Sequence, residues 1–127
     1  MYGTTTHRRN LEQYSHVINI EEVNLLDNNN IKNLIEKIKP DFIIHIAWKL
    51  EGNDSFQTSS ENMEWLRVSI FLIEQSVKNN VKKVVFAGNS SEYDFSERPL
   101  IESDDMKCVN LYGKYDKRAS RELFQKQ

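Results

Sequence analysis

The chain has 127 residues, of which 39% are hydrophobic and 28% charged, with a formal net charge of −2. These values predict one globular domain with a core, and they exclude an intrinsically disordered chain. The 17 Lys+Arg are balanced by 19 Asp+Glu, so the net charge gives no positive electrostatic potential that would attract nucleic acid or an anionic membrane. No apolar stretch could span a bilayer, the N-terminus lacks a signal-peptide core, and Cys108 is the only cysteine. We therefore expect a cytoplasmic protein with no disulfide, no metal site, and neither a membrane nor a nucleic acid as partner.

The apolar pattern predicts alternating strands and helices along the chain. Short strands are expected at 2–4 and 17–20, followed by a helix at about 29–39 that Pro40 ends. A buried strand follows at 41–47, then a polar loop at 49–60 and a long amphipathic helix with apolar positions from Met63 to Val77. The last predicted elements are a strand at 83–87, a loop at 90–110 and a helix from about 111 to the end.

This order predicts an α/β domain with a parallel sheet spanning residues 1–127. In such sheets ligands bind beyond the carboxyl ends of the strands. Those ends fall at Thr4–Thr6, Asn24, Ala47–Trp48 and Gly88–Ser90.

Five segments in order resemble the extended short-chain dehydrogenase/reductase family, in its NAD-dependent nucleotide-sugar epimerase/dehydratase branch. The stretch Phe86–Asp94, F-A-G-N-S-S-E-Y-D, is similar to that family's fifth strand and catalytic turn. Residues 2–5 are similar to the family's second strand, and residues 24–27 to the D-L-x-D turn at the end of its third strand. Residues 40–48 are similar to the fourth strand, with Asn62 in the helix that follows it. Residues 111–113 are similar to the segment with the Y-G that opens the catalytic helix.

The resemblance implies a partial Rossmann-like, doubly wound sheet and hydride transfer between NAD or NADP and a sugar carbon of a nucleotide sugar. Tyr112 would be the general acid/base, and Asn89 or Ser90 would contact the reacting oxygen. The implied cofactor contacts are Thr4, Arg8, Asn24, and the backbone of Ala47 and Trp48. Arg8 and Arg9 either contact a 2′-phosphate, which favours NADP, or form a solvated basic loop.

The sequence also departs from the family pattern. The first strand with its glycine-rich phosphate turn is not in the sequence, and neither is the sugar-nucleotide segment that follows the catalytic helix. Asp116 stands four residues after Tyr112 in place of the family's Lys, and a carboxylate there would raise the pKa of the tyrosine. Asn89 replaces the usual Ser or Thr.

A doubly wound sheet without its first strand leaves two half-sheets with open inner edges. Either the two flanking strands pair with each other, or another polypeptide supplies the strand. We expect the isolated chain to be marginally stable, aggregation-prone and inactive.

Three hypotheses follow. The chain is part of a nucleotide-sugar epimerase, dehydratase or ketoreductase; it is a degenerate, non-catalytic remnant; or it is a binding module that keeps the crevice without chemistry. Homodimerisation through residues 60–79 and the last helix is expected from the family. Among single residues, we expect Asp27 to cap a helix and His45 to be a core histidine, Trp48 and Trp65 to pack, and Asp104–Asp105 to be a solvated loop.

Overall fold

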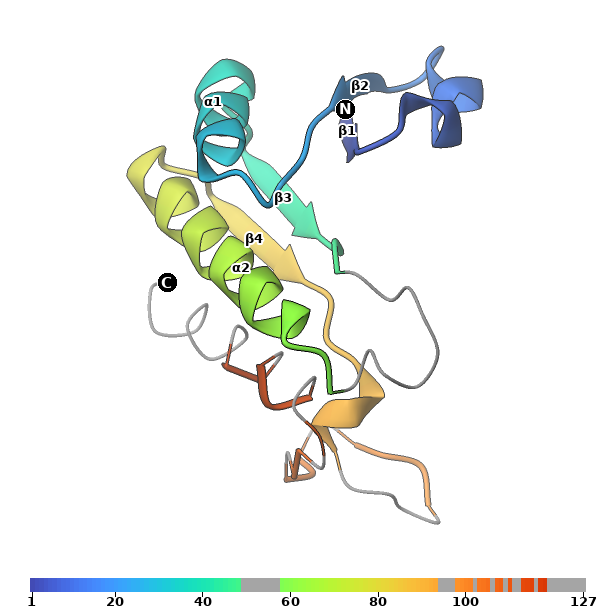
Figure 1. Cartoon of the computed structure of the whole chain (residues 1–127), viewed down its shortest axis with the longest axis vertical. Coiled ribbons are helices and arrows are strands. Elements are labelled where there is room, and N and C mark those ends of the chain that lie inside the picture. The colour runs from blue at the N-terminus through green and yellow to red at the C-terminus, as the bar shows by residue number, and fades with distance from the viewer. Residues whose placement is uncertain are drawn as a thin grey trace.

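The computed structural model describes residues 1–48, 58–93, 98–101, 103–105, 107–108, 110, 113–115 and 117–118. Within these residues, the elements whose two ends are both described are four short strands, two α-helices and three 3-10 turns (Figure 1). The strands are β1 (Tyr2–Thr5), β2 (Asn19–Glu22), β3 (Phe42–His45) and β4 (Lys83–Phe86); the helices are α1 (Asn28–Ile38) and α2 (Glu61–Lys78); the 3-10 turns are η1 (Arg8–Asn10), η2 (Glu12–Tyr14) and η4 (Ser90–Glu92).

The strands form two separate parallel pairs. β1 pairs with β2, with Tyr2 opposite Asn19, and β3 pairs with β4, with Phe42 opposite Lys83. Among the described residues, β1 and β3 do not pair with each other. The half-sheets predicted from the sequence are therefore present, and direct pairing across the gap, one of the two expected outcomes, does not occur.

Helix α1 begins and ends as its sequence predicts. The Asp27 side chain accepts a hydrogen bond from the backbone N–H of Asn29 at 2.9 Å, which confirms its role as the N-cap. Lys39 takes a left-handed conformation, with φ 48°, directly after the last helical residue. Pro40 then prevents the helix from continuing.

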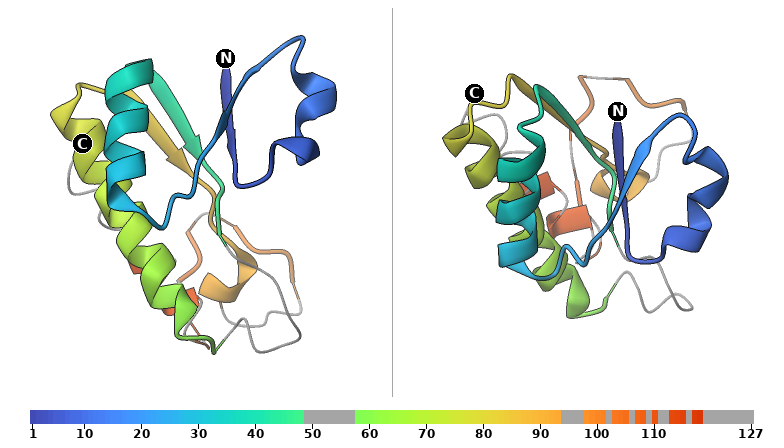
Figure 2. Two further views of the ribbon diagram at one scale, coloured as in Figure 1. Left: turned by 45° about the horizontal axis from the view of Figure 1, so that its top comes forward. Right: turned by 90° about the horizontal axis from the view of Figure 1, so that it is seen from above.

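The core lies between the two helices and one face of the β3–β4 pair. Ile31 and Ile35 of α1 pack against Val68 and Leu72 of α2, and Ile43 of β3 joins them from the sheet. Figure 2 shows both helices on the same side of this pair. The other face carries exposed apolar side chains: Phe42, Ile44 and Ile46 are 68%, 72% and 75% exposed.

The N-terminal part differs from the prediction in two ways. The second strand covers Asn19–Glu22, two residues later than expected, and Val17 lies in a turn with 60% exposure. The apolar pattern misplaced this strand because its second half is Glu21–Glu22, which an edge strand tolerates. The turns η1 and η2 were not predicted, since they contain few apolar residues.

The remaining elements agree with the prediction to within a few residues. β3 and β4 are shorter than the expected 41–47 and 83–87, and α2 begins at Glu61. Residues 113–115 and 117–118 are helical, as expected for the last helix, whose other positions lie outside the described residues. No helix in the described ranges is long and apolar enough to cross a membrane.

Candidate functional site

The described candidate residues all lie at one edge of the fold. All four strands run in the same general direction in the views of Figure 2, so the segments that follow them leave on the same side. Thr4 lies in β1, Arg8 in η1, Asn24 after β2, Ala47 and Trp48 after β3, and Asn89 and Ser90 after β4.

A basic hollow of about 510 Å³ follows β1. Its lining consists of His7, Arg8, Arg9 and Glu22. The backbone N–H of Arg8 donates to the Glu22 carboxylate at 3.4 Å, and the N–H of His7 donates to the Thr5 hydroxyl at 3.1 Å. Two guanidinium groups beside one carboxylate make a site suited to an anion such as a phosphate.

Asn24 shapes the turn between β2 and α1. Its side-chain oxygen accepts the N–H of Leu26 at 3.0 Å, and its carbonyl accepts a hydrogen bond from the Asn30 side chain, also at 3.0 Å. The side-chain oxygen of Asn24 therefore already has a partner, and this residue positions the loop beyond β2.

Trp48 connects the end of β3 to α2. Its indole Nε1 donates to Oδ1 of Asn62 at 3.0 Å, and Asn62 is buried. The position of Asn62 was marked by the family resemblance, but its acceptor role depends on a contact across 14 residues that no local pattern reveals.

The turn after β4 is a reciprocal cap. The Asn89 side chain accepts the N–H of Ser91 at 2.7 Å, while the Glu92 carboxylate accepts the N–H of Asn89 at 2.8 Å. Glu92 is only 3% exposed, and its carbonyl accepts a hydrogen bond from the Cys108 thiol at 3.5 Å. The N-x-x-E spacing is the local signal of such a cap, and Glu92 is a structural residue of this turn that was not predicted as one.

Two glycines let backbone segments approach this turn. A Cβ added to Gly88 would lie 2.5 Å from Glu92 Oε1, and one added to Gly113 would lie 2.0 Å from the Ser91 carbonyl oxygen. The N–H of Gly113 also donates to the Asn110 side chain at 2.8 Å. The last helical segment therefore begins against the turn that contains Asn89 and Ser90. Tyr112 and Asp116 lie outside the described residues.

His45 is a core residue, as predicted. Its Nε2 lies 3.1 Å from the Ser69 hydroxyl, which donates to the Trp65 carbonyl at 2.9 Å. Because that hydroxyl has a single hydrogen, His45 must donate from Nε2. Its ring also lies 4.9 Å from that of Phe86, centroid to centroid. Burial lowers the pKa of His45 to about 4, so the ring is neutral at physiological pH.

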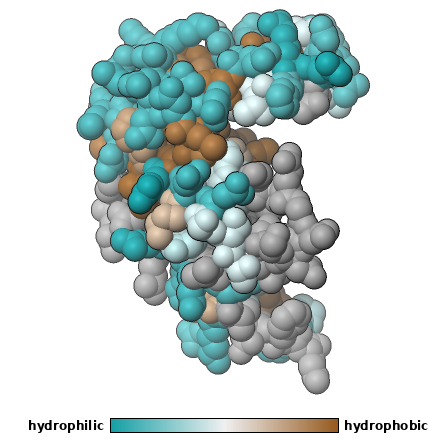
Figure 3. Space-filling view, viewed as in Figure 1, coloured by the Kyte–Doolittle hydropathy of each residue, from teal (hydrophilic) through white to brown (hydrophobic). Residues whose placement is uncertain are grey.

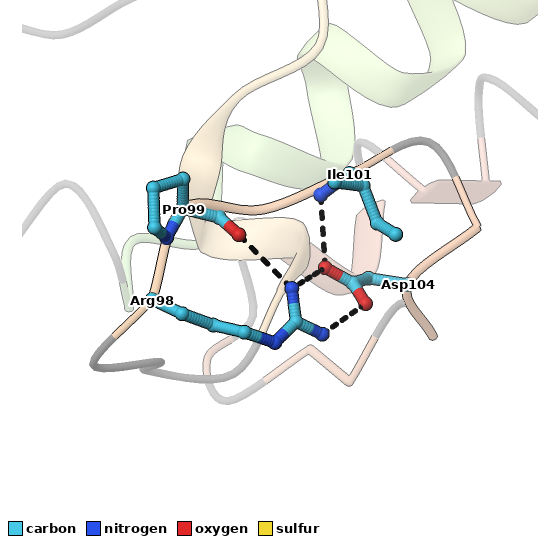
Figure 4. Close-up of polar contacts among 4 residues, drawn as sticks. All are labelled: Arg98, Pro99, Ile101 and Asp104. Atoms are coloured by element: carbon cyan, nitrogen blue, oxygen red, sulfur yellow. Dashed lines mark hydrogen bonds and ion pairs between the residues drawn. The ribbon is translucent and has the colours of Figure 1, made fainter.

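An ion pair between Arg98 and Asp104 stabilises the loop in which Asp104–Asp105 were expected to be solvated. Arg98 binds Asp104 through both of its terminal nitrogens, at 3.0 and 2.5 Å, and also donates to the Pro99 carbonyl (Figure 4). Asp104 accepts the N–H of Ile101 at 2.9 Å. These bonds, led by the one from Arg98, lower the pKa of Asp104. Asp104 and Asp105 lie in a loop as expected, and the pairing of Asp104 with Arg98 was not predicted because the two residues are six positions apart and carry no periodic signal.

Within the described ranges, no three His, Cys, Asp or Glu side chains group as metal ligands would.

Solved structures of nucleotide-sugar enzymes share this fold. The chain aligns with the UDP-Glc/GlcNAc 4-epimerase of Campylobacter jejuni at 22% identity and a TM-score of 0.77, covering 94% of this chain and 38% of that one. The NAD complex of Thermus thermophilus UDP-glucose 4-epimerase gives 17% identity and a TM-score of 0.75, covering 85% and 36%. The GDP-D-glycero-L-gluco-heptose synthase of C. jejuni, solved with NADPH, gives 20% and 0.67, covering 90% and 37%.

The chain thus spans less than two-fifths of the length of these enzymes. The model of the NAD dependent epimerase/dehydratase family matches residues 3–126, almost all of the sequence. The half-sheets and their carboxyl edge correspond to a partial Rossmann-like fold, and the chain belongs to the NAD dependent epimerase/dehydratase family.

Proposed function

We propose that this chain is the cofactor-binding part of an NAD(P)-dependent enzyme that acts on a sugar carbon of a nucleotide sugar. The observation that carries the proposal is the turn after β4. There the last helical segment meets the Ser91 carbonyl through Gly113, directly after Tyr112 in the sequence. This contact supports a single site in which Tyr112 is the acid/base and the Asn89–Ser90 turn contacts the reacting oxygen.

The cofactor is held, in this proposal, along the carboxyl edge. Thr4, Arg8 and Asn24 lie on the β1–β2 side, and the backbone of Ala47 and Trp48 lies on the β3 side. The basic hollow supports NADP over NAD, because Arg8 and Arg9 match a 2′-phosphate in charge. Glu22 opposes this preference, since its carboxylate shares the hollow.

The cofactor assignment is tested by thermal melts of the chain with millimolar NADP or NAD. Ligand at 100 times its Kd adds about 2.7 kcal/mol to the free energy of unfolding, which raises Tm by several degrees. We expect NADP to raise Tm more than NAD, Arg8→Ala to abolish the difference, and Glu22→Gln to enlarge it. Arg67→Ala, on the exposed side of α2, is the matched control. Equal shifts with both cofactors in the unaltered chain would refute the NADP preference.

The reaction is tested in a chimera in which this chain replaces the matching segment of the C. jejuni 4-epimerase. We expect epimerisation that Tyr112→Phe reduces by at least 100-fold, the usual contribution of a positioned general acid/base. An active chimera that tolerates Tyr112→Phe would disprove the role of that tyrosine.

A non-catalytic remnant is the second candidate, and the cap at Asn89 favours it. The Asn89 side-chain oxygen is already bonded to Ser91, whereas the family uses a hydroxyl at this position. In an inactive chimera, Asn89→Thr with Asp116→Lys separates the two candidates. Activity restored only by both changes supports the remnant.

The proposal includes a homodimer that uses α2 and the last helix, as well as a cytoplasmic location. Met63 and Val77 are apolar side chains that α2 leaves 36% and 53% exposed. Sedimentation of the chain and of Val77→Glu tests the dimer, since a buried charge would dissociate it. A monomer at every concentration of the unaltered chain would rule it out.

A further inference from the structure

We propose that Asn24 makes the cofactor site selective for a 6-oxopurine dinucleotide, in which a carbonyl replaces the 6-amino group of adenine. This selectivity rests on the proposed cofactor-binding function and deepens it, because it assigns a residue that distinguishes one purine base from another. It concerns only the β1–β2 side of the site and is independent of the catalytic role of Tyr112.

The side-chain amide of Asn24 is oriented by its own turn. The N–H of Leu26 donates to Oδ1 of Asn24 at 3.0 Å. Because an N–H group requires an acceptor, this bond fixes which end of the amide is oxygen and which is nitrogen. Nδ2 therefore lies on the side away from the Leu26 N–H. Nδ2 carries two N–H donors on an exposed side chain, and within the described part of the chain no acceptor is bonded to them.

The main chain of Asn24 is held by the start of α1. Its carbonyl accepts the Asn30 side-chain amide at 3.0 Å and the N–H of Asp27 at 3.3 Å. Asp27 is in turn bonded to the N–H of Asn29 as the helix cap. The turn is thus connected to the first turn of α1 by several hydrogen bonds, and Nδ2 is a donor whose position is set before any ligand binds.

Asn24 lies at the rim of the basic hollow. The parallel ladder continues one residue beyond β2, because the N–H of Val23 donates to the Thr5 carbonyl at 2.8 Å. Side chains two residues apart on an extended chain point to the same face, with about 7 Å between their Cα atoms. Asn24 is therefore on the same face as Glu22, which lines the hollow. Figure 3 shows that the surface of this N-terminal part of the chain, at the upper right, is mostly hydrophilic, as a site for a polar ligand requires.

The purine of the cofactor is attached close to the group that the hollow would hold. In the proposed complex the 2′-phosphate lies at Arg8 and Arg9. The base is bonded to the ribose carbon next to the one that carries this phosphate. A base held in this way lies at the rim of the hollow, where Asn24 offers it a donor.

The donor decides which purine fits. The 6-position of adenine carries an amino group, which is itself a donor, whereas a 6-oxopurine carries a carbonyl, which is an acceptor. The Asn24 amide facing the amino group would oppose two donors and form no bond, but it can donate to the carbonyl. An aspartate at this position would have the opposite preference, because its second oxygen would be an acceptor.

Two dinucleotides that differ only at the 6-position, and in the N1 proton that accompanies the oxo group, test the proposal. They are NADP and nicotinamide hypoxanthine dinucleotide phosphate. Calorimetric titration of the full chain gives a Kd for each. We expect the hypoxanthine compound to bind about fivefold more tightly, the ratio that one net hydrogen bond supplies. Equal Kd values would overturn the proposal, and so would tighter binding of NADP, which would mean that Nδ2 donates to a ring nitrogen.

Asn24→Asp should reverse the preference. It keeps the size of the side chain and an oxygen for the Leu26 N–H, but it replaces the donor by an acceptor. Asn29→Asp is the matched control, because it adds the same charge at an exposed position in the first turn of α1. The control should leave the ratio of the two Kd values unchanged. An equal change of this ratio in both variants would overturn the proposal, since charge alone would explain it. If Asn24→Asp fails to fold, the ratio in the unaltered chain decides.

The side-chain amide of Asn24 is also a direct probe. In ¹⁵N-resolved NMR spectra of the full chain, one of its two proton signals should move downfield when the hypoxanthine compound binds. NADP should leave both signals near their original positions. Signals that do not move at saturation with the hypoxanthine compound would overturn the proposal, even if the Kd values differ in the expected direction.

The same titrations distinguish this selectivity from the proposed function. Binding of both dinucleotides with equal Kd values, weakened by Arg8→Ala, would support the proposed cofactor site and overturn only the selectivity of Asn24. Binding of neither dinucleotide at millimolar concentration would overturn both.

Discussion

The indole nitrogen of Trp48 and the side-chain oxygen of Asn62 are joined by a hydrogen bond of 3.0 Å, which ties the end of β3 to the first turn of α2. Asn62→Ala removes a buried acceptor, and we expect it to lower the free energy of unfolding by about 1–3 kcal/mol. Trp48→Phe removes the donor. Because the two groups are partners, the double variant should lose less than the sum of the single losses. Urea denaturation of the four proteins measures this coupling, and strict additivity would contradict it.

The pH dependence of stability should report the burial of His45. Its pKa is about 4 in the folded chain against about 6.5 when unfolded, so the unfolded state binds the proton more readily. The contribution of His45 to the free energy of unfolding is greatest above pH 6.5. It decreases as the pH drops towards 4, by about 3 kcal/mol in total. His45→Gln cannot titrate and should lack this loss. Urea melts at pH 7, 6 and 5 test the prediction, with His16→Gln, at an exposed position, as the control.

Gly88 should resist substitution although it is exposed. The Cβ of Gly88→Ala would displace the Glu92 carboxylate from the Asn89 N–H. We expect a loss of about 1–3 kcal/mol, the cost of a buried polar group without its partner. Gly3→Ala is the matched control, because its Cβ would meet only the flexible ends of two side chains, Ile18 at 3.1 Å and Leu11 at 3.6 Å. Chemical denaturation compares the two, and similar losses would argue against the role of Glu92.

The Arg98–Asp104 pair should be visible in the titration of the carboxyl group (Figure 4). In the unaltered chain the Asp104 pKa lies below its ordinary value, chiefly through the hydrogen bond from Arg98. Arg98→Gln should move this pKa up towards the ordinary value. Carbon-detected NMR of the carboxyl group follows the change, and Arg67→Gln, on α2, should leave it unaltered. A pKa unmoved by Arg98→Gln would assign the effect to the Ile101 N–H.

The parts of the fold that the sequence predicted are those with local signals. The spacing of Ile31 and Ile35, the Asp27 cap and Pro40 define α1 within one residue at each end. The apolar run at 41–47 identifies β3, although only Phe42–His45 pair with β4. The strand ends, and with them the candidate site edge, follow from the same signals.

The contacts that hold the site together were not predictable in this way. The Trp48–Asn62 bond and the pairing of Arg98 with Asp104 join residues through tertiary contacts, for which a single sequence carries no periodicity. The Glu92 cap is local, but its burial depends on the segments around Cys108 and Gly113. Sequence patterns therefore place the candidate residues on an edge without showing which of them already have partners.

The buried hydrophobic residues stabilise only one of the two parts of the fold that form the candidate site edge. No hydrophobic residue before Ile31 is buried, whereas the buried cluster joins α1 and α2. The β1–β2 unit is linked to this body by the chain beyond β2 and by the ion pair between Glu21 and Lys37, at 2.8 Å. Thr4 and Arg8 thus belong to the β1–β2 unit, which is weakly anchored. Ala47 and Asn89 belong to the more rigid part of the fold that contains the buried cluster of α1 and α2. A dinucleotide that contacted both the β1–β2 unit and the rest of the fold would hold them together. Its binding would then be thermodynamically coupled to the packing of the β1–β2 unit against α1 and the β3–β4 pair.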